Sequence, residues 1–596
     1  MNPKYTVLTK ILKICMIKLS IITKALSRRM IEICFEDGGI FMFQRRKRFL
    51  ALSIAAMLVA ATVSGCGQNS DKVGADDKAP GEEIEKIAIS ELTFPIVESP
   101  ITLTWFYVLD EKTSATKKSF DEVEAYKKVQ ELTNIDIEFQ HPPVGQETEQ
   151  FNLMMASGDL ADIVFYGWRN QYPGGPSKAI SENLILPLND LIDQYSPNLK
   201  KIYQENPQFE KDAKTDQGEL YAYPGGSYEI FQRTTEPKPA FFTFGWQIRQ
   251  DWLDKVGLEV PETMDEWYEV LTAFKTLDPN ENGQADEIPL IHKGIDVNNW
   301  LRAWGANYGY YIEENTVKFG QNEPVYKEYL ETMNKWYEEG LLDIDYVTTD
   351  GKQFDAKVTN SISGAWTGST SGTFGRFVQL MKDKEPTAKL TGTVQPYIAS
   401  SEPYNFDGAS FYPVEAHGAA ISAKCKYPEE AAMFLDIGFS DEGDALYNWG
   451  IEGESYTIEN GDYKLTDQIT NNPDGLSLDQ ALAQYAPGAN NGVMFNSKSL
   501  WNQRMWMPEQ HEAVSRWSVG SGDRILPPIT PTAEESAKVA DIMNKVNTYT
   551  DEMLHKFIMG IVPISEYDNY LKNIRDMGIE EAIAINQSAL DRYLKR

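Results

Sequence analysis

A ten-residue stretch, Asp278 to Glu287, carries oxygen-bearing side chains in a pattern that suits a hard cation. Asp278, Asn280 and Asn282 alternate along the chain, and Gly283 follows where a tight loop must turn. Ca²⁺ takes about 6–8 oxygen ligands, and alternate side chains on a tight loop converge on one point. The pattern begins like an EF-hand, but Pro289 stands where that loop places a bidentate Glu. We therefore expect either a polar turn after a helix at 266–277 or, preferably, a structural Ca²⁺ site with the ligands Asp278, Asn280, Asn282, Gln284 (through its backbone carbonyl), Asp286 and Glu287.

Signatures of covalent catalysis are missing from the sequence. The segment 368–372 has the spacing of a nucleophile elbow, but its centre is Thr370 rather than Ser. His511-Glu512 lacks the second His of a zinc-protease helix. Two carboxylates suffice for glycoside hydrolysis, so a secreted glycoside hydrolase stays open as an alternative to a protein without enzymatic activity.

Cys66 has the sequence setting of a lipid-attachment site. Four basic residues at 45–48 precede an apolar run at 49–63, which ends in Ser64-Gly65-Cys66. This order is typical of a secretory signal peptide, and the run is shorter than the roughly 20 residues of a membrane-spanning helix. Its end resembles the lipobox of bacterial lipoproteins, in which the cysteine is lipidated and becomes the first residue. We interpret residues 1–65 as an upstream extension and signal peptide, with Met42 as the true start; a plain signal peptide with an incidental cysteine is the alternative.

Composition limits the partners of the remaining chain. The formal net charge is −32 for the full sequence and −40 without residues 1–65. Such an acidic surface argues against nucleic acid as a partner. Residues 66–98 begin with a polar stretch and are expected to form a lipidated, disordered tether. After lipidation of Cys66 only Cys425 is left, so no internal disulfide is expected.

The elements that must position these residues alternate between strands and helices. Alternating residues predict strands at 101–106, 135–139 and 161–165, and helical spacing predicts helices at 119–133 and around 151–155. Strands that alternate with helices indicate an α/β fold with a mostly parallel sheet.

Several segments together resemble one protein family. Ser157-Gly158-Asp159-Leu160-Ala161-Asp162, the segments 218–224 and 245–258, His417 to Ser422 and the segment 449–456 occur in the order and spacing of extracellular solute-binding proteins of carbohydrate ABC transporters. The resemblance is to family 1, which is maltose-binding-protein-like. It extends from about residue 100 to the C-terminus, and the loop at 278–287 is similar to that of the larger, calcium-binding, alginate-binding-protein-like branch.

The resemblance implies a two-lobed periplasmic-binding-protein-like fold with a hinge and an interlobe ligand cleft. Lobe 1 would begin with residues 99–244, and residues 245–416 would form lobe 2 with the calcium loop. Residues 417–596 would return to lobe 1 and supply C-terminal helices that complete the cleft.

The same resemblance directs attention to aromatic residues in loops. A sugar ring has apolar faces surrounded by hydroxyl groups, so aromatic rings can stack on it while polar side chains bond its rim. Trp252, Trp267 and Trp336 have helical spacing and are expected in the core, whereas Trp501, Trp506 and Trp517 could lie in the cleft or in the core. The predicted ligand-binding residues are Tyr107, Asp110, Trp168, Arg169, Trp304, Trp366, Trp449 and Glu452.

These expectations combine into one functional prediction. The chain would be a monomeric lipoprotein at the extracellular face of the cytoplasmic membrane of a Gram-positive-like cell. It would capture an oligosaccharide by hinge closure and deliver it to the permease subunits of an ABC importer. A sensory module and an oligopeptide binder are the alternatives, and the sequence leaves the sugar and its length open.

Overall fold

The computed structural model describes residues 88–89, 92–143, 145–225, 227–228, 243–382, 384–406, 417–489 and 492–596. The chain divides into two units, residues 1–84 and 85–596, and every described residue belongs to the second. The predicted signal peptide and lipidated Cys66 lie outside the described residues. Within the described ranges no helix is long and apolar enough to cross a membrane.

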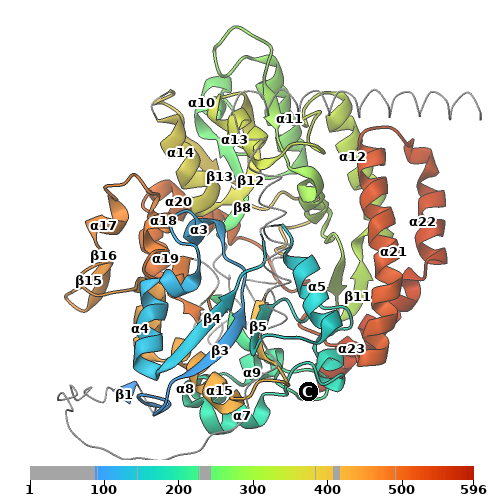
Figure 1. Cartoon of the computed structure of the whole chain (residues 1–596). Helices are drawn as coiled ribbons and strands as arrows, with labels where there is room; N and C mark the ends of the chain where they lie inside the picture. Colours follow the sequence, from blue (N-terminus) through green and yellow to red (C-terminus); the bar gives the residue numbers. More distant parts are fainter. Residues whose placement is uncertain are drawn as a thin grey trace, which may run out of the picture. The chain divides into compact units, whose positions relative to one another are not determined.

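The first of two main sheets has the strand order β4-β3-β5-β14-β6 (Figure 1). β3 (Ile101–Phe106) pairs in parallel with β4 (Ile135–Gln140) and β5 (Ile163–Tyr166), as the alternating sequence predicts. β14 (His417–Ile421) runs antiparallel to β5 and to β6 (Tyr223–Gly225), so its first residue lies beside the last residues of β5. The helices of this lobe include α4 (Glu124–Thr133), α5 (Glu147–Ser157), α6 (Gly175–Ser181), α7 (Asn189–Tyr195), α8 (Pro197–Glu205), α9 (Pro207–Ala213) and α15 (Pro428–Asp436).

The second sheet has the order β13-β8-β12-β9 and a hydrophobic core of its own. β12 (Ser363–Ser369) runs antiparallel to β8 (Phe244–Arg249) and parallel to β9 (Ile288–Leu290), and β13 (Leu390–Gly392) completes the other edge. Two sheets with separate cores make the molecule two-lobed. Further elements of this region are α10 (Gln250–Val256), α11 (Met264–Thr276), η3 (Gly294–Trp304), β10 (Tyr310–Glu313), β11 (Thr316–Phe319), α12 (Val325–Glu338), α13 (Gly351–Thr359), η5 (Thr370–Gly375) and α14 (Arg376–Met381).

Local sequence explains the helices of the second lobe. The capping box of α11 pairs the Thr263 hydroxyl with the Glu266 amide, while the Glu266 carboxylate accepts from the Thr263 amide. Trp267 and Phe274 recur at helical spacing and are fully buried. Trp252, Trp267 and Trp336 are all at most 1% exposed, which confirms the prediction that they belong to the core.

The last part of the chain packs against elements of both sheets. α20 (Pro508–Trp517) contacts β8 and β13 of the second sheet, whereas the long helix α21 (Ala533–Ile558) contacts both α12 and α6. α23 packs along β11. The remaining elements after β14 include α16 (Asp441–Asp444), η8 (Ala445–Trp449), β15 (Tyr456–Glu459), β16 (Asp462–Leu465), α17 (Asp467–Thr470), α18 (Leu478–Leu482), β17 (Phe495–Asn496), α19 (Lys498–Arg504), α20 (Pro508–Trp517), α21 (Ala533–Ile558), α22 (Tyr567–Asp576) and α23 (Ile579–Lys595).

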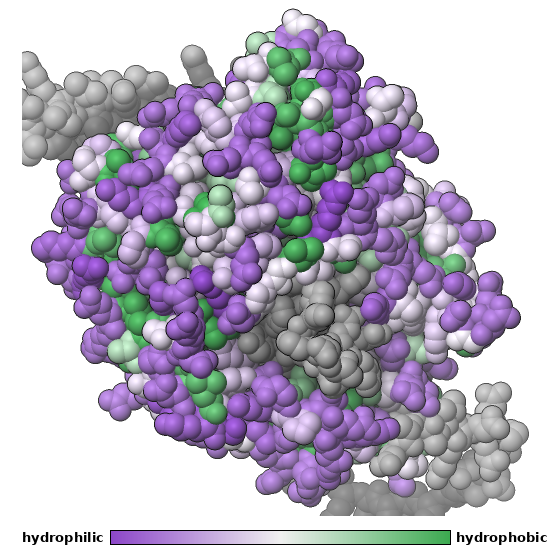
Figure 2. Space-filling view, turned by 180° about the vertical axis from the view of Figure 1, so that it is seen from behind, coloured by the Kyte–Doolittle hydropathy of each residue, from purple (hydrophilic) through white to green (hydrophobic). Residues whose placement is uncertain are grey.

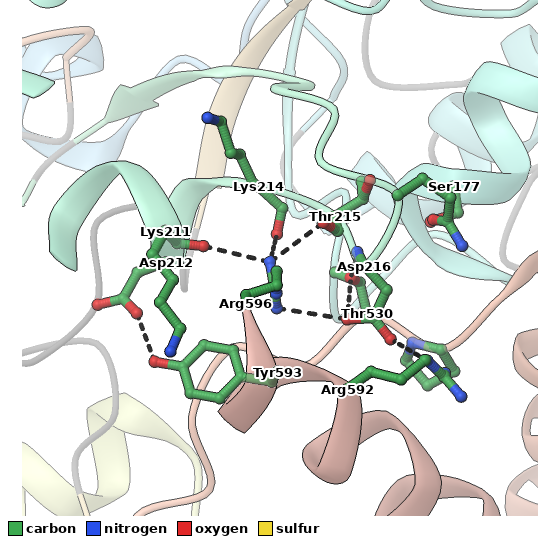
Figure 3. A network of polar contacts seen from close by, with 12 residues as sticks. Ser177, Lys211, Asp212, Lys214, Thr215, Asp216, Thr530, Arg592, Tyr593 and Arg596 are labelled. Carbon is green, nitrogen blue, oxygen red and sulfur yellow. Dashed lines mark hydrogen bonds and ion pairs between the residues drawn. The ribbon is translucent and has the colours of Figure 1, made fainter. Parts of the chain in front are cut away.

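The end of α23 is fixed to the segment after α9 by a polar cluster (Figure 3). Arg592 Nε lies 2.7 Å from Oδ2 of the buried Asp216, and Arg596 Nη2 lies 3.3 Å from its Oδ1. Arg596 also donates to the carbonyl oxygens of Lys211, Lys214 and Thr215. The Tyr593 hydroxyl donates to Asp212 Oδ1 at 2.6 Å. The C-terminal helix therefore joins β11, beside the second lobe, to α9 of the first.

Candidate functional site

A first cavity of about 540 Å³ lies at the carboxyl end of the first sheet. Tyr107 follows the end of β3, Phe165 and Tyr166 end β5, and His417 begins the antiparallel β14. Ligands of open α/β sheets bind at this edge, where the loops that follow the strands gather. The cavity is lined by Tyr107, Val108, Asp110, Lys112, Phe120, Glu147, Thr148, Phe165, Tyr166, Gln171, His417, Asn496 and Trp501.

Aromatic rings line much of this first cavity. Tyr107 lies 4.7 Å from Phe165 and 4.5 Å from Phe120, measured between ring centroids. Phe165 stacks on His417 at 5.7 Å with the two planes 14° apart. Burial, with a smaller effect of Asp110, raises the pKa of Tyr107 far above its usual value, so its hydroxyl stays protonated. Burial lowers the pKa of His417, which leaves its imidazole neutral near pH 7. The aromatic lining is therefore uncharged.

Asp110 has a structural task at the rim of this cavity. It is the N-cap of α3 (Glu111–Ser114), and its carboxylate accepts from the backbone amides of Lys112 and Thr113 at 2.8 and 3.1 Å. The Thr113 hydroxyl donates to its second oxygen at 2.7 Å. N-cap carboxylates satisfy amides that the helix leaves unpaired. Asp110 thus sets the direction of α3 and places Lys112 at the cavity wall.

A second cavity of about 280 Å³ lies at the start of β8 in the other lobe. Trp517 of α20 enters it and donates from Nε1 to the Trp246 carbonyl oxygen at 2.8 Å. A Cβ on Gly245 would lie 2.4 Å from Cγ of Trp517, so only glycine leaves room for the indole. The cavity is lined by Phe244, Gly245, Trp246, Asn299, Arg302, Thr367, Gln395, Asn405 and Trp517.

In the second cavity, Gln395 has a side-chain hydrogen-bond donor that no described group accepts. Its Oε1 accepts from Trp246 Nε1 at 3.3 Å, and its side chain is only 6% exposed in total. Its Nε2 is buried and has no hydrogen-bond partner within the described part of the chain. A buried amide nitrogen without a partner is costly, so a ligand hydroxyl in this cavity would be a favourable acceptor.

Two consecutive helices serve the two cavities. α19 carries Trp501 into the first, and α20, which begins at Pro508, carries Trp517 into the second. Trp506, between them, is 61% exposed and lines neither cavity. A movement of this stretch would therefore affect both cavities.

The structure brings Tyr107 and Asp110 together in the first cavity, but it buries the four predicted tryptophans. Trp168, Trp366 and Trp449 are at most 1% exposed and Trp304 is 8% exposed, and none lines either cavity. Arg169, after Trp168, is half-buried and Glu452 is exposed; neither lines one of the two cavities described above.

Local structure explains these placements. The Trp168 indole turns back and donates to the Val164 carbonyl oxygen at 3.2 Å. Trp366 does not lie in a loop, because Ser363–Ser369 forms β12, and its indole donates to Gln247. Trp449 stacks on Tyr463 at 5.3 Å.

The sequence did not identify the cavity-lining residues whose position beside a cavity depends on the fold. Phe165 and His417 read as ordinary strand residues, and only their position at the sheet edge brings them to the cavity. Trp246 reads as a core residue of β8. Of the three tryptophans that the sequence leaves open, the structure places Trp501 and Trp517 in one cavity each, whereas Trp506 lines neither.

The loop at 278–287 closes on itself through its own polar groups. The Asp278 carboxylate accepts from the amides of Asn282 and Gly283 at 3.2 and 3.0 Å. The Asn282 side-chain amide donates to both oxygens of Asp286. Throughout the described ranges, no three side chains of His, Cys, Asp or Glu converge closely enough to hold a metal ion.

Glu287, at the end of the same loop, has a buried carboxylate oxygen that no described group satisfies. The residue is 1% exposed, and its Oε1 has no partner among the groups that the structure describes. Burial, together with the charges of Asp278 and Asp286, raises its pKa. The residue types of this loop suit a hard cation, because a buried carboxylate without a partner would gain a counter-ion and because asparagine side chains can present oxygen after rotation.

Comparisons with known proteins agree with this architecture. Residues 111–445 match the family described as bacterial extracellular solute-binding protein. The fructooligosaccharide ABC transporter substrate-binding protein FusA of Streptococcus pneumoniae is 25% identical over 92% of this chain and 99% of its own. Lipoprotein LipO of Bacillus subtilis is 26% identical over 74% of this chain and 79% of its own.

Solved structures share the fold. The alginate-binding protein AlgQ2, solved without calcium ion, superposes with a TM-score of 0.69 at 25% identity over 83% of this chain and 99% of its own. FusA in complex with kestose superposes with a TM-score of 0.67 at 22% identity over 83% of this chain and 100% of its own, and an EF-hand mutant of FusA has also been solved.

Proposed function

Because the chain belongs to the family of bacterial extracellular solute-binding proteins, we propose that it captures an oligosaccharide and delivers it to the permease of an ABC importer. One observation carries this proposal: each lobe presents a cavity that combines aromatic rings with polar side chains. FusA, which is named for fructooligosaccharides and solved with kestose, supports the ligand class.

The two cavities have the chemistry that a sugar chain requires. The half-buried Trp501 in the first cavity supplies flat apolar surface for C–H faces, whereas Trp246 and Trp517, at 2% and 3% exposure, line the second cavity with only small parts of their rings. Gln395 Nε2 is available to donate to a hydroxyl group. Tyr107 and Asp110 contribute to the wall of the first cavity. The four buried tryptophans have a supporting role, because they belong to the hydrophobic cores beneath this surface: Trp168, Trp304, Trp366 and Trp449.

Capture would proceed by rotation of the two lobes about a hinge, as in other two-lobed binders. In this scheme residues 99–244 and 245–416 are the main parts of lobes 1 and 2. Residues 417–596 return to lobe 1 with β14, but the expected return does not hold for their whole length, because α20 and α21 pack against β8, β13 and α12 of lobe 2. Closure would bring the cavity of each lobe onto one ligand, so a sugar of several rings would contact both. We infer that the ligand leaves chemically unchanged.

We also propose that the loop at 278–287 binds Ca²⁺ with a structural role. Asp278, Asn280, Asn282, Asp286 and Glu287 would supply side-chain oxygens, and Gln284 a backbone carbonyl. Two observations support this assignment: the buried Glu287 oxygen has no partner among the described groups, and the similar protein AlgQ2 has a structure that was solved without calcium ion. None of residues 278–287 lines either cavity, which favours stability over ligand contact.

The N-terminal sequence and the surface suggest where the protein acts. A lipid, such as palmitate, on Cys66 would hold it at the extracellular face of a cytoplasmic membrane, with residues 66–98 as the tether. On the face shown in Figure 2 the surface is mainly hydrophilic, and hydrophobic residues are scattered in small groups. This surface, together with a net charge of −40 without residues 1–65, suits a monomeric protein outside the cell.

A ligand screen followed by calorimetry tests the proposal. Kestose, nystose, trigalacturonate and an alginate trisaccharide are added in a thermal-shift assay, and any sugar that raises the melting temperature is titrated. Trp501→Ala should weaken its binding about tenfold or more, whereas the exposed Trp506→Ala serves as the matched control and should leave it unchanged. Equal binding by both variants would remove the proposed site, and turnover of the sugar would favour a hydrolase.

A further inference from the structure

The indole of Trp501 is backed by a buried cation. Arg504 lies one turn later on α19, and its Cζ is 4.0 Å from the Trp501 ring centroid. Residues three positions apart on a helix are neighbours on its surface. The Arg504 side chain is 1% exposed. The indole thus has a guanidinium stacked on it, while Trp501 also lines the first cavity.

Arg504 is held in turn by a carboxylate that it shares with the cavity wall. Its Nε donates to Asp479 Oδ1 at 2.8 Å, and Asp479 Oδ2 lies 3.3 Å from Lys112 Nζ. Burial alone would raise the pKa of Asp479, but the charges of Arg504 and Lys112 hold it at about 2. Asp479 therefore remains charged at any physiological pH. The chain of contacts runs from the indole through Arg504 and Asp479 to Lys112, which itself lines the cavity.

Local structure fixes each member of this chain of contacts. α3 starts at the Asp110 cap, which positions Lys112, and α18 starts at the capping box of Ser477 and Gln480, which positions Asp479. α19 starts at Ser497, whose hydroxyl accepts from the Leu500 amide. Beneath α18 and α19 lies a small hydrophobic cluster that contains Trp449 together with Leu482 and Leu500. The predicted ligand residue Trp449 thus supports this arrangement from below.

We propose that Arg504, held by Asp479, which also pairs with Lys112, is a positioning residue that fixes the orientation of the Trp501 indole for stacking on a sugar ring. Only the contact between Trp501 and the sugar rests on the proposed function; the orientation itself is a property of the ligand-free protein. A guanidinium is planar and stacks on aromatic faces, whereas a lysine ammonium is a compact point charge. The shape of Arg504, and not only its charge, should therefore matter.

The first test needs no ligand. The Trp501 contribution to near-ultraviolet circular dichroism is obtained by subtracting the spectrum of Trp501→Phe, first with Arg504 present and then with Arg504→Met and Arg504→Lys. We expect Arg504→Met to reduce this contribution by at least half and Arg504→Lys to restore only part of it. Asp479→Asn, which should give an intermediate loss, replaces Arg504→Met if that variant does not fold.

Arg376→Met is the matched control, because Arg376 also lies over a ring, Phe377 at 4.6 Å, and also pairs with a carboxylate, Asp355 at 2.7 Å. It should leave the Trp501 contribution intact. An unchanged Trp501 contribution in folded Arg504→Met or Asp479→Asn would overturn the proposal.

The second test is a double-mutant cycle on binding of kestose, nystose, trigalacturonate and the alginate trisaccharide. Arg504→Met should weaken binding about tenfold, and it should have no further effect when Trp501 is already Ala, because residues that act as a unit are not additive. An equal loss in both backgrounds would show that Arg504 acts independently of Trp501. If Trp501→Ala binds as well as the unchanged protein, the proposed sugar contact fails, while the dichroism still decides the positioning role.

Discussion

The polar cluster at the end of α23 (Figure 3) offers a quantitative test of how the C-terminal helix is held. The Asp216 side chain is 1% exposed and faces Arg592 and Arg596, whose side chains are 34% and 14% exposed. The Thr530 hydroxyl also donates to it, at 3.3 Å. Asp216→Asn keeps the size of this side chain but removes its charge. The substitution leaves the largely buried guanidinium of Arg596 without its carboxylate.

The expected cost follows from these exposures. Breaking a buried ion pair from one side costs about 3–5 kcal/mol. Because water screens the more exposed Arg592, and because it retains Glu535 at 2.5 Å, we expect about 2–3 kcal/mol for Asp216→Asn. With an unfolding entropy of about 2.1 cal/mol/K per residue, a lobe of roughly 250 residues should melt about 4–6 °C lower.

Differential scanning calorimetry measures this shift. Asp541→Asn on α21 is the matched control, because its carboxylate pairs with Lys545 at 2.8 Å but is 67% exposed, and it should leave the melting temperature unchanged. A shift of less than one degree for Asp216→Asn would refute the reasoning that the ion cluster anchors α23.

Three further predictions concern the metal loop, the second cavity and a buried carboxyl. Asp278→Ala should lower the melting temperature and abolish its dependence on added Ca²⁺; an unchanged calcium response would rule out the predicted site. Gly245→Ala should displace the Trp517 indole, lower the melting temperature and weaken sugar binding by calorimetry, whereas Gly351→Ala, whose added Cβ meets no atom within 4 Å, should change neither. Burial raises the pKa of Asp436 to about 6, although its carboxylate accepts from the Asn198 and Leu199 amides at the start of α8. The folded state therefore binds this proton more tightly than the unfolded state, whose pKa is about 3.9, so Asp436 reduces stability as pH rises from about 4 to 6. Between pH 4 and 6 the free energy of unfolding, measured in urea, should therefore fall by about 2 kcal/mol less in Asp436→Asn than in the unchanged protein. An identical pH profile of the two proteins would contradict the assignment.

The elements of the fold were more predictable than its surfaces. Alternation at 101–106 and 135–139 predicted β3 and β4 correctly, because a strand with one face packed on a core repeats every two residues. Helical spacing likewise identified the buried faces that carry Trp252, Trp267 and Trp336. These patterns are local, so a single segment of sequence contains them.

The lining of the cavities depends on contacts that no single segment contains. Trp449 and Trp501 are both tryptophans after helical turns, yet one lies under α18 and the other in the cavity wall. What separates them is the packing of Leu482 and Leu500 around Trp449 and the ion pair of Arg504 with Asp479. Partners of these two kinds are far apart in the sequence, so residue type and local spacing could not distinguish a supporting indole from one that lines a cavity.

The central claim, that two lobes close around one sugar, is tested most directly by small-angle X-ray scattering of the protein with and without the sugar found in the ligand screen. The account predicts a smaller radius of gyration at saturation, with the same molecular mass and an intact sugar recovered afterwards. A radius of gyration that stays the same while calorimetry shows the sugar fully bound would contradict it.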